Sequence, residues 1–197
     1  MFEVLENVNT DSRHWRVEDC AVFYKTRELH GGLSNMAGGF PLTVNGVAIR
    51  TSEALYQACR FPALPEVQRV IIEQASPIAA KMKSKPHRDR TRADWMNLRV
   101  DIMYWCLLVK LTQNWQGFGE VLAATGELPI VEKSRKDPFW GAREVDAETL
   151  HGANILGQLL MILRRQWKED SIPEVIEPIG VDNLLLFGRQ IEAVVRR

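Results

Sequence analysis

Apolar residues recur along several stretches of the chain at the spacing of one helical face. From position 94 onward they advance in steps of three and four, at Trp95, Leu98, Ile102, Trp105 and Val109. Such a stripe packs against a core, so we expect the central helix here. The same spacing runs through 152–167, and 183–197 is also expected to be helical, as an accessory segment that closes the chain.

Further helices are expected from the residues that start them. Thr51 and Ser52 place hydroxyl groups ahead of an apolar pattern, and Ser76 precedes Pro77. A hydroxyl side chain caps free amide groups at a helix start, and proline suits the first helical position. These signals predict helices that begin near Ser52 and near Pro77. A shorter helix is expected over 118–124.

Strand signals are fewer. Asn45-Gly46 separates two short apolar runs, and because both residues tolerate a positive φ, the pair predicts a tight β-hairpin. Short strands are expected at 21–24 and 130–133, with a Gly-rich loop over 25–39. No succession of alternating strands and helices indicates a parallel sheet. We therefore expect a mainly α (α+β) fold, a single domain over 1–197 with a small β-hairpin element.

The composition is that of an ordinary globular protein, with 46% hydrophobic and 25% charged residues, which excludes the disordered and fibrous classes. The 25 Lys and Arg residues balance 25 Asp and Glu, so net charge favours no partner. Cys20, Cys59 and Cys106 lie far apart, which argues against a disulfide framework and a zinc site. Without a signal segment or a membrane-length apolar run, we expect a soluble, cytoplasmic protein.

One segment departs from this charge balance. Residues 81–99 carry seven Lys and Arg side chains against two Asp, close to a proline and to Trp95. Such a run is either a solvated face or a site for phosphate or nucleic acid.

The standard nucleotide, hydrolase and metal motifs are absent, so the chemical candidates are isolated polar residues. Glu53 is either an acid that stabilises a helix start or a catalytic carboxylate held by a rigid backbone. Arg60 lies on nearly the same helical face, where it pairs with that acid, binds phosphate or is solvated. Lys110 borders the apolar stripe. It either reaches solvent or points inward, where burial would lower its pKa and favour nucleophilic attack.

Two later segments add candidates. Asp137-Pro138-Phe139-Trp140-Gly141 is either a tight turn with a buried aromatic anchor or a loop that contacts a sugar and stacks on a base. Asn154, after Gly152-Ala153, and Asn35, in the Gly-rich loop, are further polar positions that the fold does not obviously need.

Taken in order, these pieces resemble the NADAR superfamily, which includes the bacterial YbiA-like proteins. The resemblance begins with Gly32-Leu33-Ser34-Asn35-Met36 and Thr51-Ser52-Glu53-Ala54-Leu55-Tyr56-Gln57-Ala58. It continues through Ser76-Pro77, Lys81, Trp95, Lys110, Val131-Glu132, Asp137, Trp140-Gly141 and Gly152-Ala153-Asn154. It covers residues 22–167, and its ordered set of motifs is more specific than any one of them.

The resemblance implies a compact, mostly helical domain that cleaves N-glycosidic bonds to ribose. Members act on phosphoribosylamine intermediates of riboflavin synthesis, or remove ADP-ribose from guanine bases as antitoxins to DarT-type ADP-ribosyltransferases. This chain has Ala142 where YbiA-like members have Asp, and Arg60 where many have Lys. Its additional basic residues after position 81 favour a polyanionic substrate, ADP-ribosylated guanine in nucleic acid, over a small monophosphate.

Such a reaction builds positive charge on the sugar and needs carboxylates and a proton donor. We assign Glu53 to stabilising the sugar cation or activating the attacking group. Asp137 is assigned to orienting the ribose hydroxyls or to acting as the second acid. The two roles could be exchanged, and both side chains are expected to act on the same sugar. Lys83 or Lys110 is the alternative, through a Schiff base. Substrate contacts are assigned to Asn35, Arg60, Trp95, Trp140, Gly141 and Asn154.

No metal or cofactor is called for. The expected partners are ADP-ribosylated DNA as substrate and an ADP-ribosyltransferase toxin as functional counterpart, with no membrane. Two alternatives stay open. One is a glycosidase for the ribosylaminopyrimidine phosphates of riboflavin synthesis, and the other is a non-catalytic module that binds ADP-ribose.

Overall fold

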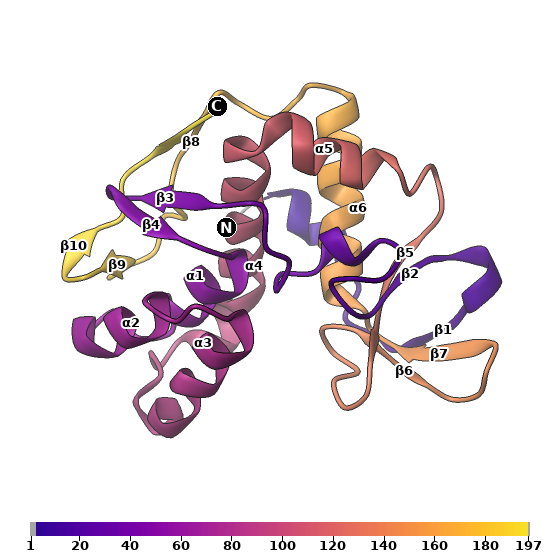
Figure 1. Ribbon diagram of the computed structural model, residues 1–197, viewed down its shortest axis with the longest axis horizontal. Helices are drawn as coiled ribbons and strands as arrows, with labels where there is room; N and C mark the ends of the chain where they lie inside the picture. The colour runs from indigo at the N-terminus through magenta and orange to yellow at the C-terminus, as the bar shows by residue number, and fades with distance from the viewer. Residues whose placement is uncertain (1–2, 197) are drawn as a thin grey trace. The chain divides into compact units, whose positions relative to one another are not determined.

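The computed structural model describes residues 3–196. The chain forms two compact units. The first consists of 35–115 with 173–196, and the second of 3–34 with 116–172. Figure 1 labels the helices and strands of both units.

The first unit is built around one long helix. Its elements are the strands β3 (Leu42–Val44) and β4 (Val47–Ile49) and the helices α1 (Ser52–Ala58), α2 (Pro65–Ile72), α3 (Pro77–Ser84) and α4 (Trp95–Gln113). The strands form the expected hairpin, with Asn45 and Gly46 at φ 51° and 76°. Helix α1 packs against α2, α3 and α4 (Figure 1). Helices begin where the capping signals predicted them, and α2 had not been predicted.

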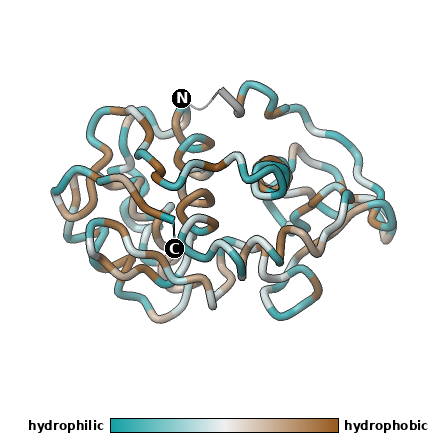
Figure 2. The backbone as a smooth tube through the Cα atoms, turned by 90° about the horizontal axis from the view of Figure 1, so that it is seen from above, coloured by the Kyte–Doolittle hydropathy of each residue, from teal (hydrophilic) through white to brown (hydrophobic). Residues whose placement is uncertain are grey.

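Helix α4 is the core of this unit. Every residue from Asp101 to Thr112 is buried, and hydrophobic positions dominate the helix (Figure 2). The sequence predicted a single apolar stripe, but a helix that is apolar around most of its circumference is enclosed on all sides. Within residues 3–196, no helix is both long and apolar enough to cross a membrane.

The predicted C-terminal helix over 183–197 is wrong. Its described part forms short antiparallel strands instead: β9 (Leu185–Leu186) pairs with β10 (Arg189–Gln190), and β11 (Val194–Val195) pairs with β8 (Val175–Ile176). Phe187 and Gly188 both have positive φ, 53° and 77°, which makes a tight reversal that no helix contains. Asn45 fixes this segment, because its amide bonds the Gln190 carbonyl (2.9 Å) and the Glu192 amide (2.9 Å).

The second unit contains a five-stranded mixed sheet, which is more β structure than the sequence predicted. Its order is β1-β7-β6-β5-β2, from β1 (Arg13–Arg16), β2 (Ala21–Phe23), β5 (Ile130–Ser134), β6 (Ala142–Glu144) and β7 (Thr149–Gly152). Strand β5 runs parallel to β2 and to β6, so the expected absence of parallel pairing is also corrected.

Two helices complete the second unit. They are α5 (Trp115–Ala123), which begins within the first unit's residues, and α6 (Ile155–Lys168). Helix α6 packs against β5 (Figure 1). Trp15, Val131, Ala142 and Leu150 form an apolar cluster on one face of the sheet, which leaves the alternate positions of the same strands for polar side chains.

Candidate active site

Glu53 is a buried carboxylate in the first turn of α1. Thr51 caps this helix, because its hydroxyl oxygen accepts a hydrogen bond from the Ala54 amide (3.3 Å). Glu53 is only 5% exposed, whereas an acid that merely stabilises a helix start usually remains solvated. The backbone therefore places a charged group inside the first unit, a position that requires compensating partners.

Two side chains supply those partners, and a backbone hydrogen bond holds the turn that carries Glu53. Gln57, one turn later, donates from Nε2 to Glu53 Oε1 (3.0 Å). Lys81 on α3 holds its Nζ 3.8 Å from the same oxygen. The Glu53 amide donates to the Asn35 carbonyl (3.1 Å). The carboxylate is thus fixed by a neutral donor and approached by a cation that is itself half exposed.

Asn35 ties the Gly-rich loop to the start of α1. Ser52 donates its hydroxyl to Asn35 Oδ1 (3.0 Å), and Asn35 Nδ2 lies 2.8 Å from the Met103 sulfur. Because both ends of the amide are engaged inside the protein, Asn35 positions the helix that carries Glu53.

Arg60 extends the network away from the carboxylate. It donates to Gln57 Oε1 (3.2 Å) and to the Thr91 hydroxyl (3.1 Å). Its guanidinium lies 5.2 Å from the Trp95 ring, and Trp95 packs on Tyr56 at 4.9 Å. Burial lowers the pKa of Arg60 and raises that of Tyr56, whose pKa the Glu53 carboxylate raises further. Since Arg60 occupies the Gln57 oxygen, it turns the Gln57 amide so that the nitrogen faces Glu53.

The two lysines predicted as nucleophiles, Lys83 and Lys110, differ in their exposure to solvent. Lys83 is exposed on α3, and Lys81 of the same helix is the one that approaches Glu53. Lys110 is 1% exposed, and its Nζ lies 4.7 Å from the Phe40 ring centroid. Of the two alternatives that the sequence left open, the structure shows an amine that points inward, and this burial lowers the pKa of Lys110 to about 7.

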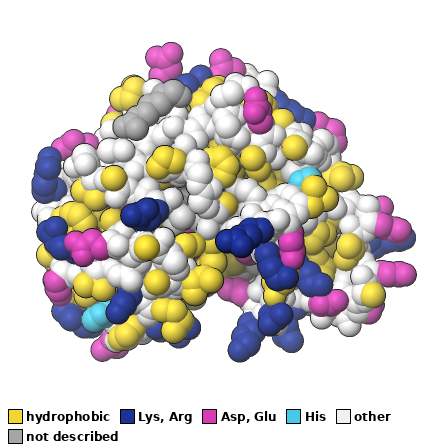
Figure 3. Space-filling view, in the orientation of Figure 1, with side chains coloured by type: hydrophobic (Ala, Val, Ile, Leu, Met, Phe, Trp, Pro, Cys, Tyr) yellow, Lys and Arg dark blue, Asp and Glu magenta, His cyan; other side chains and the backbone are white. Residues whose placement is uncertain are grey.

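The basic run forms a surface on α3 and the short 3-10 helix Lys85–Arg90 that follows. Its exposed members are Lys81, Lys83, Lys85, Arg88 and Arg90. Lys and Arg side chains are visible over this part of the first unit, at the lower left of Figure 3. Arg92 differs, because its side chain is buried against Asp94.

In the second unit, Asp137 belongs to a tight turn. Its Oδ1 accepts from the amides of Phe139 (3.0 Å) and Trp140 (3.0 Å), and its own amide donates to the Ser134 hydroxyl (3.0 Å). Asp137 is exposed. One carboxylate oxygen therefore shapes the turn that presents Trp140, which is half-buried against Phe139 at 5.1 Å between ring centroids.

Gly141 and Asn154 hold this turn against β5. A Cβ atom at Gly141 would lie 2.6 Å from the Glu132 carbonyl, so only glycine fits there. Asn154 is fully buried at φ 54°, donates to the Ile130 carbonyl (2.8 Å) and accepts from the Glu132 amide (3.0 Å). Both ends of its amide are used by the strand, so Asn154 positions β5.

A basic hollow of about 280 Å³ adjoins the same turn. It is lined by Tyr24, Lys133, Ser134, Arg135, Arg143 and Glu144. Lys133 pairs with Glu144 at 2.8 Å. Ser134 belongs both to the hollow and to the Asp137 turn. No group of three or more His, Cys, Asp or Glu in the described chain is placed to hold a metal ion.

The fold and these residues define an α+β protein in which a buried, positioned carboxylate lies beside basic and aromatic side chains. The chain belongs to the NADAR family, since residues 22–168 match the NADAR domain. This match includes parts of both units.

Named relatives agree with this membership. The chain is 33% identical, over 82% of its length, to riboflavin biosynthesis protein VVA0006 of Vibrio vulnificus, and spans 42% of that protein. It is 30% identical to N-glycosidase Npun_R5314 of Nostoc punctiforme, covering 73% of this chain and 90% of that one. The NMR structure of Escherichia coli YbiA is similar, with a TM-score of 0.64, 29% identity, and coverage of 78% of this chain and 88% of YbiA.

The predicted site residues fall into two sets. Unit one brings together Asn35, Glu53, Arg60 and Trp95, and unit two brings together Asp137, Trp140, Gly141 and Asn154. That Glu53 and Asp137 act on one sugar stays a prediction. The sequence assigned no role to Gln57 or Glu132 and counted Lys81 only within the basic run, although each lies within a matched motif. Glu132 is a half-buried acid whose Oε2 would lie 3.2 Å from a Cβ at Gly141.

Proposed function

We propose that this protein is an N-glycosidase that removes ADP-ribose from ADP-ribosylated guanine in nucleic acid. The observation that carries the proposal is the buried Glu53 carboxylate, oriented by Gln57 and approached by Lys81. One relative of matching length is named an N-glycosidase. The proposal includes a DarT-type ADP-ribosyltransferase as functional counterpart.

Cleavage of the ribose C1–N bond needs negative charge beside C1. As the bond breaks, its electron pair moves to the base nitrogen and C1 becomes cation-like. A carboxylate held in a low-dielectric position stabilises that charge without having to reorganise. Water then adds to C1, and its proton goes to the departing base. Glu53 supplies the carboxylate, and its hydrogen bond from Gln57 keeps it in place.

The charge of the surroundings favours a polyanionic substrate. The exposed basic surface of α3 and the following 3-10 helix includes Lys81, whose Nζ lies 3.8 Å from a Glu53 oxygen. The basic hollow beside the Asp137 turn adds three cations against one acid. A diphosphate within a nucleic-acid strand offers more negative charges to such basic side chains than a single phosphate does. That Trp140 stacks on the base stays a prediction from the sequence.

A second candidate substrate is a ribosylaminopyrimidine phosphate of riboflavin synthesis. It is favoured by the names of two relatives, the Vibrio protein and the maize chloroplast protein PYRR, which is 30% identical over 73% of this chain. Of these two relatives the chain spans 42% and 24%. The same carboxylate chemistry would serve either substrate, because both contain a ribose C1–N bond.

A Schiff-base route is the alternative to direct displacement by water. The amine of Lys110 has its pKa lowered to about 7 by burial, so a large neutral fraction is available for attack on the aldehyde of a ring-opened sugar. Lys83, by contrast, is exposed on α3. Reduction with borohydride during turnover would attach the sugar to the attacking lysine, which peptide mass spectrometry identifies.

The test is the substitution Glu53→Gln, assayed on an oligonucleotide that carries ADP-ribosylated guanine. We expect release of ADP-ribose to fall at least about 100-fold, because the amide cannot balance the sugar cation, while ADP-ribose binding is retained. The control is Glu73→Gln, since Glu73 is an exposed acid in the same unit. Unchanged release by E53Q would remove Glu53 from the mechanism. Binding without turnover by the wild-type protein would identify a binding module instead.

A further inference from the structure

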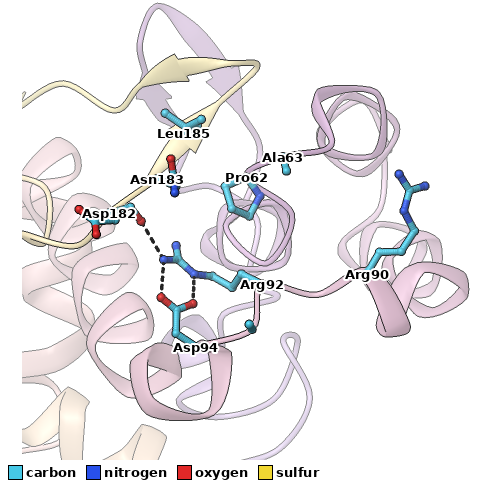
Figure 4. A pocket seen from close by; sticks show the side chains of 9 residues that line it. Pro62, Ala63, Arg90, Arg92, Asp94, Asp182, Asn183 and Leu185 are labelled. Atoms are coloured by element: carbon cyan, nitrogen blue, oxygen red, sulfur yellow. Dashed lines mark hydrogen bonds and ion pairs between the residues drawn. The ribbon is translucent and has the colours of Figure 1, made fainter.

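The first unit contains a hollow that the proposed chemistry does not use. It has a volume of about 480 Å³ and lies where three segments meet. Pro62 and Ala63 come from the connection after α1, Arg90, Arg92 and Asp94 from the approach to α4, and Asp182, Asn183 and Leu185 from the C-terminal segment (Figure 4).

A buried guanidinium forms the floor of this hollow. The Arg92 side chain is 6% exposed. Its Nε and Nη2 donate to the two Asp94 oxygens (2.6 and 2.9 Å), and Nη2 also donates to the Asp182 carbonyl (2.9 Å). Nη1 is buried without a hydrogen-bond partner. In Figure 4 the guanidinium nitrogen without a dashed line faces Asn183, on the side away from Asp94, so this donor borders the hollow that Arg92 and Asn183 both line.

These surroundings select a neutral, planar, polar ligand for the interior. Asp94 already balances the charge of Arg92, so Nη1 offers a donor to a carbonyl or ring-nitrogen acceptor and has little excess charge for a phosphate. Asn183 carries an amide that can both donate and accept. Pro62 and Leu185 supply apolar walls. Apolar walls with a few directed polar groups are typical of a nucleobase site.

The rim suits the phosphate attached to such a base. Arg90 lies at the edge of the hollow (Figure 4), its side chain 51% exposed and 3.8 Å from Glu66. An exposed arginine at that distance from its acid can turn to a phosphate oxygen at little cost. A base inside the hollow and its phosphate at the rim is the arrangement expected for one nucleotide of a single strand.

The hollow is joined to the Glu53 network through the backbone. The Arg92 amide donates to the Arg60 carbonyl (2.9 Å), so the connection after α1 and the segment before α4 are hydrogen-bonded to each other. These two segments present Arg60, Thr91 and Trp95 to the Glu53 network. Asp182, Asn183 and Leu185 lie beyond the family match at 22–168, so this chain builds the hollow partly from its own C-terminal segment.

We propose that the hollow binds the base of a nucleotide that neighbours the modified guanine, with Arg92 and Asn183 on the base and Arg90 on its phosphate. The inference rests on the proposed function and specifies its substrate as a single strand, not a free nucleotide.

Binding of a fluorescein-labelled, unmodified single-stranded oligodeoxynucleotide tests the proposal without requiring turnover. Ala63 is exposed at the rim, so Ala63→Trp fills the entrance with little strain on the core. We expect A63W to weaken binding about tenfold, the loss of roughly one base contact. Ala75→Trp, at an exposed position in the same unit, should bind like the wild type. Wild-type affinity in A63W, or no binding by the wild type, would overturn the proposal.

A second variant and a second readout separate this inference from the glycosidase proposal. Arg90→Ala, at an exposed position, should weaken oligonucleotide binding and lower its salt dependence by about one phosphate contact. In turnover, A63W should lower kcat/KM for the modified oligonucleotide about tenfold more than for ADP-ribosylated deoxyguanosine. Equal losses on both substrates would contradict a neighbouring-base site. Absence of all turnover would reject the glycosidase proposal alone, because the binding experiment decides the hollow independently.

Discussion

Lys110 shows how burial alone changes the chemistry of one residue. In the folded protein burial lowers the pKa of its amine to about 7, from 10.5. Between these values the unfolded chain binds the additional proton, so the free energy of unfolding rises with pH. Below pH 7 the full cost of burying the cation is present, and it disappears as the pH approaches 10.5.

This linkage predicts the pH dependence of Lys110→Met. The variant removes the buried cation and fills the same space, so it should be more stable than the wild type at pH 7. The difference in the free energy of unfolding should shrink by about 1.4 kcal/mol per pH unit between pH 8 and 10. Denaturant unfolding of both proteins across that range measures it. A constant difference would mean that Lys110 titrates alike in the folded and unfolded chain.

The sequence could single out Glu53 as a candidate because a carboxylate in a helix's first turn is a local feature. It did not identify what orients that carboxylate, since Lys81 is brought to Glu53 by the packing of α3 against α1. The same limit applies to Asn154. Its two backbone partners, on Ile130 and Glu132, lie more than 20 residues away, so its structural role follows from tertiary contacts alone.

At the scale of elements, helix starts could be predicted because their signals are local and chemically specific. Ser76 accepts a hydrogen bond from the Ala79 amide (3.1 Å), as its position before Pro77 indicated. The Asn45-Gly46 hairpin formed for the same reason, with both turn residues at positive φ.

The cap at Ser76 can be tested without disturbing the core, because Ser76 is exposed. Ser76→Ala removes the acceptor for the Ala79 amide and should lower the free energy of unfolding by about 1 kcal/mol. Ser76→Asp keeps an acceptor and should retain most of the stability. Urea denaturation compares the three proteins. Equal stability of S76A and the wild type would show that this cap contributes nothing.

Elements without a local signal could not be predicted. Strands β1, β6 and β7 are three or four residues long, and β1, with sequence RHWR, buries only Trp15. Such strands are defined by their neighbours in the sheet. The C-terminal segment has apolar residues at helical spacing, but Gly188 interrupts them, and the reversal at Phe187-Gly188 determines the structure. Gly188 was the one residue in the sequence that argued against a helix in this segment.

At the scale of the whole molecule, the net charge does not indicate a substrate class, whereas the distribution of charge over the surface does. Although acidic and basic residues are equal in number, the first unit concentrates exposed cations on α3 and the following 3-10 helix, and the second concentrates them around the Asp137 turn. Local basic surfaces bind polyanions whatever the total charge of the protein is. This distribution is the physical reason to prefer a nucleic-acid substrate to a small monophosphate.

The most direct measurement compares two substrates with the wild-type protein: an oligonucleotide carrying ADP-ribosylated guanine, and the ribosylaminopyrimidine phosphate of riboflavin synthesis. The predicted result is release of free ADP-ribose that leaves intact guanine in the strand, with a higher kcat/KM than for the pyrimidine and a steep fall as salt increases. A higher kcat/KM for the pyrimidine would reverse the substrate assignment. Cleavage of neither substrate would contradict the glycosidase account as a whole.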